Sequence, residues 1–195
     1  MTHKGLGDPL LLLLSILSPH NPPVLCPSCV VLSSLLTVDN ADFSYGYMQL
    51  KGNMTLNNST LSSSWVNHFM YDNDGGTAKL TLNNSQWIAE TGGANEINIG
   101  NTNVNDRKAK GNAEIYLNSG SRISAHVLEL MDANGNKISL TANASDIVLS
   151  NEFYLGDGAT VSFTDSDLQA EKLTVNGAIT MDAASSITAK SLVYK

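Results

Sequence analysis

Few side chains in this chain are of the types that catalyse reactions, and they are widely spread. Outside the first 37 residues, the only histidines are His68 and His126, the only arginines are Arg107 and Arg122, and cysteine is absent. Serines are abundant, but no GxSxG sequence places one on the sharp elbow of a hydrolase. The residue types therefore give nucleophilic catalysis no support.

Carboxylates are the remaining catalytic candidates. Enzymes that cleave polysaccharides need clustered carboxylates, often with an arginine or a calcium ion. The acidic residues of the C-terminal part are expected at turns of different kinds: Asp157, Asp165, Asp167, Glu171 and Asp182. We therefore expect no catalytic residue, no cofactor and no enzymatic activity. A β-helical polysaccharide lyase or glycosidase, or a fragment of one, is the alternative.

Three short motifs resemble metal or redox sites. Cys26-Pro-Ser-Cys29 has the CxxC spacing of a redox pair or half a zinc site, but His20 is the only further ligand nearby. Segments 71–76 and 132–136 are oxygen-rich like calcium loops. Both lack the glutamate that completes such a loop, and the second lacks its sixth-position glycine. We expect polar loop tips there and no metal.

The first 37 residues differ from the rest of the chain. They hold all five prolines, both cysteines and the apolar runs 10–17 and 30–36. Neither run reaches the roughly 18 apolar residues of a membrane span. A weakly basic start followed by an apolar run is typical of a signal peptide, but no small-x-small cleavage site follows Leu17. We predict an atypical signal-like or mis-assigned leader over 1–37 and one domain over 38–195.

From Ala113 to Lys195 the chain repeats itself in four rows of three short strand signals. In each signal two apolar residues flank one that is usually polar, which is the period-two alternation of a strand with one face buried. The first signals begin 23, 23 and 18 residues apart. The apolar pairs of the first signal are Ile115/Leu117, Ile138/Leu140, Val161/Phe163 and Ile179/Met181; the second signals begin at Ile123, Ile147, Leu168 and Ile187; the third pairs are Leu128/Leu130, Phe153/Leu155, Leu173/Val175 and Leu192/Tyr194.

Repeats of this length indicate a solenoid, and three strands joined by Asn, Asp, Gly and Ser leave no room for a helix. Each row would be one three-sided coil, and parallel stacking at about 4.7–4.9 Å per rung would bury its apolar face. Insertions at 132–137 and 156–159 would lie at corners, where Asn134-Gly135 and Gly158 can adopt positive φ. We predict an all-β fold, a right-handed parallel β-helix.

The same pattern extends towards the N-terminus. Strand alternation occurs at Met48/Leu50 and Met54/Leu56, and the phrase that begins at Met54 recurs at Leu80, 26 residues later. Ile97/Ile99 follow 17 residues after Leu80, and Ile115 another 18 residues on. We predict a solenoid that begins near residue 42 and has about seven rungs. Asn57-Asn58 and Asn83-Asn84 are expected to form side-chain ladders at one corner.

The phrases MTLNNSTLSSSW and LTLNNSQW, with repeats such as GAITMDAASSITAKSLVY, resemble passenger domains of Gram-negative autotransporters. The resemblance covers about residues 42–195. Trp87 matches a recurring tryptophan of these rungs and Trp65 matches it loosely. The resemblance implies a right-handed β-helix that is displayed on the cell surface or secreted and is linked to the outer membrane by a translocator barrel. Because no barrel or autochaperone-like segment follows, it implies a fragment, a truncated product or another export route.

The expected function is adhesion through outward side chains and corner loops, as a virulence-type adhesin. The expected partner is a protein or glycan on a host or neighbouring cell, and the expected contact surfaces are Val66–Thr77 and Asp106–Asn112. A net charge of −7 argues against nucleic acid or an anionic membrane surface as partner. A structural stalk is a second alternative, and mixed outward residues disfavour ice binding. Further rungs or a cap are expected after Lys195, and end-to-end self-association without them.

Overall fold

The computed structural model describes residues 30–32, 35–46, 48–63, 67–89, 96–101, 103 and 105–194. These residues form strands and turns and contain no helix, so this part of the chain has no helix that could cross a membrane. The prediction of an all-β fold is confirmed. Cys26, Cys29, His20 and Trp65 lie outside the described residues. So do most of the predicted leader, including the whole apolar run 10–17, and residues 33–34 of the run 30–36.

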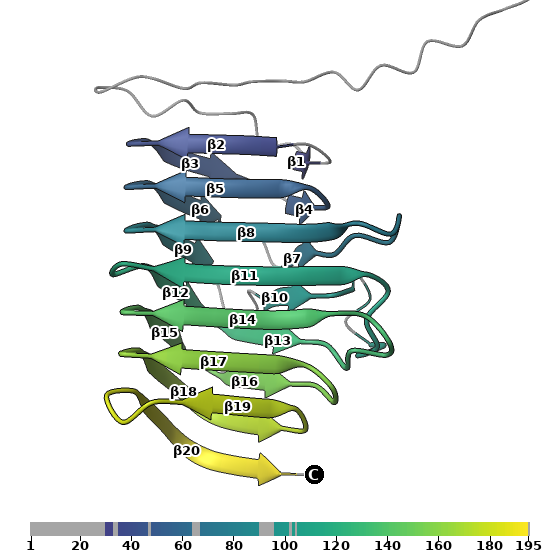
Figure 1. Cartoon of the computed structure of the whole chain (residues 1–195), viewed down its shortest axis with the longest axis vertical. Helices are drawn as coiled ribbons and strands as arrows, with labels where there is room; N and C mark the ends of the chain where they lie inside the picture. The colour runs from purple at the N-terminus through teal and green to yellow at the C-terminus, as the bar shows by residue number, and fades with distance from the viewer. Residues whose placement is uncertain are drawn as a thin grey trace, which may run out of the picture.

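The strands form three stacks, named here in the order in which the chain visits them (Figure 1). The first stack is a seven-stranded parallel sheet. Its members are β2 (Leu35–Asp39), β5 (Asn53–Asn57), β8 (Thr77–Asn83), β11 (Asn112–Asn118), β14 (Ile138–Asn143), β17 (Thr160–Thr164) and β19 (Ala178–Met181).

The second and third stacks meet in the long strand β18 (Asp167–Val175), which pairs with both of them. The second stack holds β3 (Asp42–Tyr45), β6 (Thr60–Ser63), β9 (Gln86–Ala89), β12 (Arg122–Ala125) and β15 (Asp146–Leu149). The third stack holds β1 (Val30–Leu32), β4 (Met48–Leu50), β7 (Asn67–Met70), β10 (Glu96–Ile99), β13 (Val127–Leu130) and β16 (Glu152–Leu155). The last strand, β20 (Ser186–Tyr194), pairs along the whole of β18.

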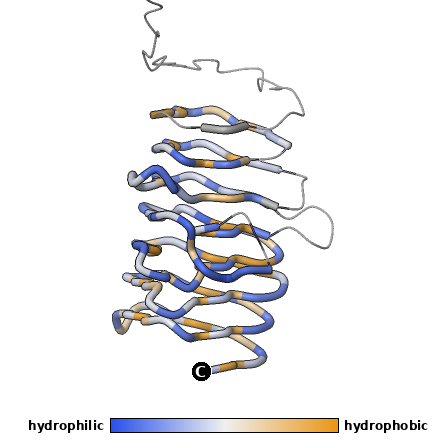
Figure 2. The backbone as a smooth tube through the Cα atoms, turned by 90° about the vertical axis from the view of Figure 1, so that its right-hand side faces the viewer, coloured by the Kyte–Doolittle hydropathy of each residue, from blue (hydrophilic) through white to orange (hydrophobic). Residues whose placement is uncertain are grey.

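All ladders between these strands are parallel, and each passage of the chain through the stacks adds one layer. Because the same side of each strand faces the interior in every layer, alternate residues are buried, as Ala78, Leu80 and Leu82 are in β8 and Ile147 and Leu149 in β15. Figure 2 shows the resulting alternation of hydrophobic and hydrophilic residues along the chain. The interior is a continuous apolar column that includes Leu80, Ile115, Leu140 and Val161.

The predicted register is confirmed for the second and third signals. Ile123, Ile147, Leu168 and Ile187 are aligned in the second stack, and Leu128, Phe153, Leu173 and Leu192 in the third. The 26-residue repeat is also confirmed, since Met54 pairs with Leu80.

Two predictions about the first signal are wrong. Ile115 pairs with Leu140, and Ile138 pairs with Ala113. A shift of two residues keeps every side chain on its face, so alternation alone cannot distinguish the two registers. Ile97 and Ile99 belong to the third stack, beside Leu128 and Leu130. The first stack instead continues from Leu80 directly to Ile115, across an insertion after β10.

Strand pairing begins before the boundary drawn at Val38. β1 pairs with β4, and β2 pairs with β5. Leu36, placed in the leader by its sequence, is a buried member of the core. An apolar residue of the second leader run therefore serves as the first interior residue of β2, and the strands start earlier than the predicted residue 42.

A small polar cluster lies inside the N-terminal layers. The indole N–H of Trp87 donates a hydrogen bond of 2.8 Å to the hydroxyl of Tyr45. The His68 ring contacts the Tyr45 ring edge-on, with centroids 5.2 Å apart. Burial raises the pKa of Tyr45 well above its ordinary value, although the hydrogen bond from Trp87 lowers it in part. His68 is fully buried, so it lies in the interior and not at a surface site.

Candidate functional site

The turns between the first and second stacks form a regular edge, called here the Asn–Ser corner. Its turn residues adopt the left-handed backbone conformation, with φ of 52°, 48° and 47° at Asn40, Asn58 and Asn84. Asparagine tolerates this conformation better than most residues, because its short side chain can bond locally. The same position is occupied further along by Ser119, Ala144 and Asp165.

Two asparagine ladders run along this corner, as the sequence predicted. The amide of Asn83 donates to Asn57 at 2.8 Å, and the amide of Asn84 donates to Asn58 at 2.8 Å. The first ladder continues from Asn118 to Asn83 at 3.0 Å and from Asn143 to Asn118 at 3.3 Å. All donors point towards the preceding layer, so the ladder ties successive layers together.

A buried serine follows each of these turns except the first, where Ala41 follows Asn40. The Ser85 hydroxyl donates to the Asn83 carbonyl at 2.8 Å and accepts the Ser59 backbone N–H at 3.0 Å. The hydroxyls of Ser59, Ser121 and Ser166 likewise donate to a carbonyl of the preceding turn and accept a backbone N–H from the preceding layer, and the Ser145 hydroxyl donates to the Asn143 carbonyl. Their polar groups face one another, so this corner is a structural joint and offers little to a partner.

The turns between the third and first stacks form the opposite side of Figure 1, called here the loop edge. We use this name for the four longer connections, which follow β7, β10, β13 and β16; two short turns of the described chain, residues 51–52 and 176–177, make the same passage after β4 and β18. Their residues are mainly hydrophilic (Figure 2). They are the segments 71–76, 100–111, 131–137 and 156–159, apart from residues 102 and 104, which lie outside the described part.

Backbone hydrogen bonds join these four connections, the first of them through Asn112 at the start of β11. Asp72 and Asn112 exchange a pair of bonds of 3.1 and 3.2 Å. Asp132 donates to the Arg107 carbonyl at 2.7 Å and accepts from Ala109 at 2.8 Å. The next layer is joined by the N–H of Ala133, which donates to the Asp157 carbonyl at 2.7 Å. The loop edge is therefore one connected surface.

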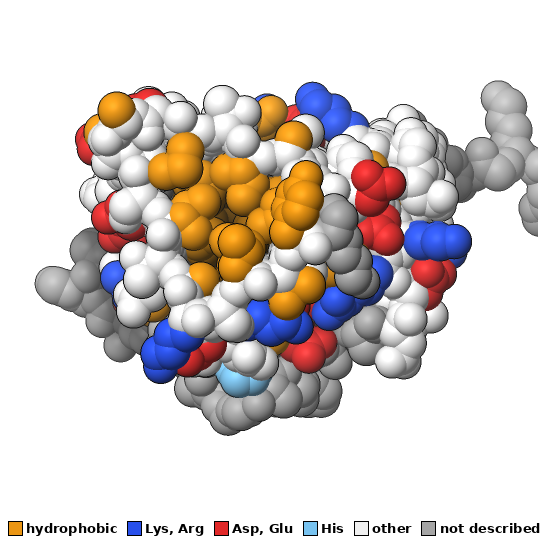
Figure 3. All heavy atoms as spheres, turned by 90° about the horizontal axis from the view of Figure 1, so that it is seen from below, with side chains coloured by type: hydrophobic (Ala, Val, Ile, Leu, Met, Phe, Trp, Pro, Cys, Tyr) orange, Lys and Arg blue, Asp and Glu red, His pale blue; other side chains and the backbone are white. Residues whose placement is uncertain are grey.

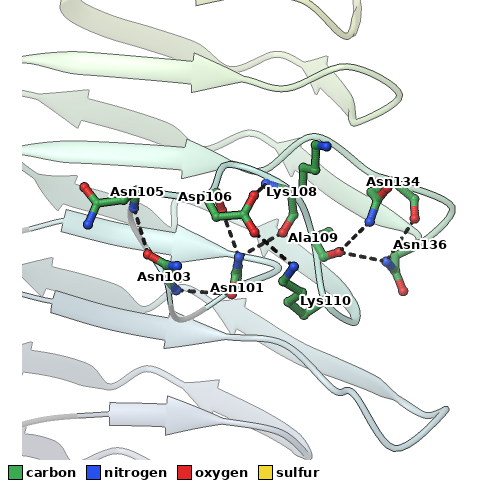
Figure 4. A network of polar contacts seen from close by, with 9 residues as sticks. All are labelled: Asn101, Asn103, Asn105, Asp106, Lys108, Ala109, Lys110, Asn134 and Asn136. Carbon is green, nitrogen blue, oxygen red and sulfur yellow. Dashed lines mark hydrogen bonds and ion pairs between the residues drawn. The ribbon is translucent and has the colours of Figure 1, made fainter.

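Side chains within the long connection 100–111 fix its shape (Figure 4). The amide of Asn101, which is almost fully buried, donates to the carbonyls of Asp106 and Lys108 at 2.8 and 2.9 Å. The ammonium of Lys110 lies 2.9 Å from the carboxylate of Asp106 and lowers the pKa of that group through a hydrogen bond. Asn134 and Asn136 both donate to the Ala109 carbonyl, at 3.3 and 3.2 Å. These bonds hold the connection against its neighbour in the next layer.

Both predicted contact segments reach the loop edge, but only in part. Asn67–Met70 of the first segment form strand β7, in which His68 and Met70 are fully buried, so only 71–76 lie on the loop edge; of the second segment, 106–111 lie there. The structure describes 67–77 of the first segment and 106–112 of the second, whereas Val66 lies outside the described residues. The Asp72–Asn112 bridge brings the two segments together. This proximity could not be read from their separation in the sequence.

The oxygen-rich motifs at 71–76 and 132–136 also lie here, and their carboxylates are bound by the protein itself. Asp72 accepts the backbone N–H of Asp74 at 2.8 Å. Asp132 accepts the Tyr154 hydroxyl at 2.8 Å and the Asp157 N–H at 2.9 Å. In the part of the chain that the structure describes, no group of three or more His, Cys, Asp or Glu side chains could hold a metal ion.

A charged cluster that the sequence analysis missed lies beside the loop edge, on the outer face of the third stack. The guanidinium of Arg107 lies 3.9 Å from the centre of the Tyr154 ring. It contacts the carboxylates of Glu129 at 2.5 Å and Glu152 at 3.9 Å. Lys172 binds Glu152 at 2.9 Å from the following layer. Two carboxylates of adjacent layers thus share one arginine.

The two carboxylates have pKa values shifted in opposite directions. Burial raises the pKa of Glu129, opposed by the charge of Arg107. Burial also acts on Glu152, but hydrogen bonds from Thr174 and Lys172 outweigh it and lower the pKa of that group. One carboxyl with a raised pKa beside one with a lowered pKa is an arrangement found in acid–base catalysis. No alternation or motif marks the two residues, because Arg107 reaches them from an insertion.

The carboxylates considered in the sequence analysis do not come together. Asp157 lies on the loop edge, whereas the Asp165 N–H binds the carboxylate of Asp182 at the Asn–Ser corner. On the outer face of the last two long strands, Asp167 accepts from Ser186 at 2.6 Å and Glu171 binds Lys190 at 2.7 Å.

Arg122 lies in strand β12 of the second stack, and the half-buried His126 directly follows that strand. The His126 ring contacts the Ser150 hydroxyl at 2.8 Å and the Asn151 amide at 3.2 Å. Arg122 donates to the hydroxyl of Ser124 at 3.0 Å. Each group is engaged by a neighbouring polar side chain.

Comparison with known protein families, curated proteins and solved structures found no match to this chain. The geometry of the Asn–Ser corner, the loop edge and the charged cluster is therefore the basis for assigning a function.

Proposed function

We propose that this chain is a right-handed parallel β-helix of about seven rungs that mediates adhesion through its loop edge. The proposed protein acts by display and not by catalysis. Its partner is a protein or glycan on a host or neighbouring cell. The observation that carries the proposal is the single connected surface made by four otherwise irregular connections on one side of the stacks.

The contrast between side-chain exposure and backbone order supports this role. Asn73, Asp74, Asn105 and Lys108 are exposed at the loop edge, whereas the backbones beside them are hydrogen-bonded across layers. Exposed polar groups on an ordered backbone bind with a small loss of conformational entropy. Amides, carboxylates and an ammonium together supply both donors and acceptors for the hydroxyl and amide groups of a glycan or protein surface.

The proposed location is the surface of a Gram-negative cell or the surrounding medium, with attachment to the outer membrane through a translocator barrel. It is supported by the resemblance of the repeats to autotransporter passenger domains. A rigid rod of stacked layers suits such display, because each layer adds the same rise and carries its loops at a fixed distance from the base.

An adhesion assay with a matched control tests the proposal. Beads coated with the purified chain are applied to immobilised glycans and extracellular-matrix proteins. A loop-edge variant replaces three exposed side chains, Asp74→Ala, Asn105→Ala and Lys108→Ala. The control replaces an acid, an amide and a lysine on the second-stack side, Asp146→Ala, Gln86→Ala and Lys190→Ala.

We expect the loop-edge variant to lose retention by about tenfold or more. Fewer than about a third of contact side chains cost more than 1 kcal/mol when truncated, but one or two of these among the three are enough for a tenfold loss. The control variant should bind like the parent chain. Equal loss in both variants would refute the loop edge as the contact surface, and retention of no bead on any spot would favour a structural stalk.

The charged cluster favours a second candidate, a polysaccharide-cleaving enzyme. In that case Glu129, with its raised pKa, would protonate the leaving oxygen and Glu152 would act as the base or nucleophile. Release of reducing ends from a panel of polysaccharides tests it. Activity that is lost in both Glu129→Gln and Glu152→Gln, with unchanged folding, would replace the adhesion proposal; inactivity of the parent chain on every substrate would remove this candidate.

A further inference from the structure

The large apolar side chains that the described chain exposes lie at the two ends of the stacks and not on the loop edge. They are Leu35 in the first layer and Met181, Leu192, Val193 and Tyr194 in the last. Figure 3 shows apolar side chains gathered at the C-terminal end. Large apolar residues of the loop edge are buried: Tyr71 is 9% exposed and Met131 0%. Because protein–protein contacts depend on apolar and aromatic anchors, the described part of the loop edge offers a protein partner no such anchor.

The loop edge is close to electrically neutral, although the whole chain has a net charge of −7. Its four connections hold five carboxylates and four basic side chains, which gives them a net charge of −1. The carboxylates are Asp72, Asp74, Asp106, Asp132 and Asp157, and the basic side chains are Arg107, Lys108, Lys110 and Lys137. A cationic partner is therefore attracted more strongly to the rest of the chain, and an anionic partner is repelled by the chain as a whole.

Most basic side chains of the loop edge are also paired with carboxylates of the chain itself. The ammonium of Lys110 lies 2.9 Å from the carboxylate of Asp106, and Lys137 forms an ion pair with Glu114. Arg107 contacts the two carboxylates of the charged cluster. A charged partner would have to replace these contacts, so recognition by charge is disfavoured at this edge.

Exposed amides lie on three neighbouring connections of the loop edge. They belong to Asn73 on 71–76, Asn103 and Asn105 on 100–111, and Asn134 on 131–137. A carboxamide has two N–H donors and an acceptor oxygen, so one bond within the chain, such as that from Asn134 to the Ala109 carbonyl, does not saturate it. Hydroxyl groups also donate and accept, so they match this set of amides.

We propose that the loop edge binds a neutral glycan, whose hydroxyl groups form hydrogen bonds with the amides of connections 71–76, 100–111 and 131–137. The inference rests on the proposed function and narrows its partner from a protein or glycan to a glycan without charged groups. Successive layers are about 4.7–4.9 Å apart, similar to the length of one sugar ring, so an extended glycan along the stacks meets one connection after another. Exposed hydrogen bonds between neutral groups are weak singly, so adhesion depends on many copies acting together.

Bead retention on matched neutral and charged surfaces tests the inference. Beads coated with the full chain are applied to dextran, mannan and galactan, to the sulfated derivative of each, and to extracellular-matrix proteins. The NaCl concentration is varied from about 0.01 to about 1 M, which shortens the Debye length from about 30 to about 3 Å. We expect retention on at least one neutral polysaccharide, no stronger retention on its sulfated derivative, and a change with salt of no more than about twofold.

A pair of double variants tests the role of the amides at unchanged net charge. Asn73→Ala with Asn105→Ala should lower retention on the neutral polysaccharide by about fivefold or more, because each hydrogen bond contributes a factor of a few. The matched control is Gln86→Ala with Gln169→Ala, which removes two exposed amides from the outer face of the second stack and should bind like the parent chain. Circular dichroism and the melting temperature report whether both variants keep the fold.

The inference is overturned by retention only on matrix proteins or sulfated polysaccharides, or by retention that falls steeply as salt is added. It is equally overturned if the Asn73/Asn105 variant binds like the parent chain or if the Gln86/Gln169 control loses retention. Retention on a matrix protein alone that is lost in the triple loop-edge variant would leave the adhesion proposal standing and overturn only this inference. Retention on none of the surfaces would overturn both.

Discussion

The Asn–Ser corner and the loop edge join the same strands yet have opposite characters. At the Asn–Ser corner, amide and hydroxyl groups bond to the equivalent group one layer away, as Asn83 does with Asn57. At the loop edge, connections of unequal length bond to different partners in each layer, as Asp72 does with Asn112 and Ala109 with Asp132. At the Asn–Ser corner the repeated polar side chains are hydrogen-bonded to the neighbouring layer. At the loop edge the inserted connections leave polar side chains exposed to solvent, where a partner can bind them.

The largest effect is expected in the interior that both regions share. Ile147→Asp would bury a carboxylate between Ile123 and Leu168 and should lower the free energy of unfolding by about 3–5 kcal/mol. Ser139→Asp, on a half-buried outer position of β14, should cost less than about 0.5 kcal/mol. Urea unfolding measures the free energy of unfolding of both variants. Similar losses would contradict the assignment of Ile147 to the interior and of Ser139 to the outer face.

A smaller but clear effect is expected at the Asn–Ser corner. Ser85→Ala removes the acceptor of the buried Ser59 N–H and should cost about 1–3 kcal/mol. Ser162→Ala, on the outer face of β17, should be close to neutral. A neutral Ser85→Ala would mean that the buried serines do not tie the layers together.

The asparagine turns allow a direct comparison of the two regions. Asn84 and Asn134 have nearly the same φ, 47° and 48°, so alanine introduces the same backbone strain at both. Asn84→Ala loses a 2.8 Å ladder bond to Asn58, whereas Asn134→Ala loses only a longer bond of 3.3 Å to the Ala109 carbonyl, to which Asn136 also donates. Asn84→Ala should therefore be less stable than Asn134→Ala by about 0.5–1.5 kcal/mol in thermal unfolding. If Asn134→Ala were the less stable variant, the side chains of the Asn–Ser corner would not tie the layers together more strongly than those of the loop edge.

The smallest effect concerns the pH dependence of stability near the charged cluster. The folded state holds the proton of Glu129 more tightly than the unfolded state, because its pKa is raised. Ionised Glu129 therefore costs stability above that raised pKa, and the cost disappears as the pH falls through it. For Glu152 the pKa is lowered, so its contribution is present above its unfolded pKa and is lost as the pH falls through the lowered value.

Glu129→Gln and Glu152→Gln should consequently change the slope of stability against pH in opposite directions. Relative to the parent chain, Glu129→Gln gains most at neutral pH, and the gain shrinks in mild acid. Glu152→Gln loses most at neutral pH, and its loss shrinks in stronger acid. Chemical unfolding at a series of pH values gives both slopes. If both substitutions changed the slope of stability against pH in the same direction, the pKa values of Glu129 and Glu152 would not be shifted in opposite directions.

Much of the repeating part of the molecule was predictable because its signals are local. Alternation of apolar residues assigned the faces of β12, β15 and β18 correctly, and recurring Asn-Asn-Ser marked the ladders. The register of Ile138 was not predictable, because a two-residue shift leaves the pattern of faces unchanged. The position of Ile97 was hidden by the insertion 100–111, which lengthens one layer of the first stack.

The loop edge and charged cluster were predictable only in part. The loops were recognisable from their Asn, Asp and Gly content, but their mutual hydrogen bonds arise from how an insertion folds back on the next layer. The contact of Arg107 with Glu129 and Glu152 depends on that fold. Local patterns thus identify what repeats, whereas the features that make one layer different require the three-dimensional arrangement.

Hydrogen exchange of the free and the bound chain tests the central claim most directly. The bound state is the chain on the glycan or matrix protein that gives the strongest bead retention. We predict that binding slows amide exchange in segments 71–76, 105–111 and 132–137 and leaves the outer face of the first stack unchanged. Slowing confined to the first-stack face or to the Asn–Ser corner would contradict the assignment of the loop edge as the adhesive surface.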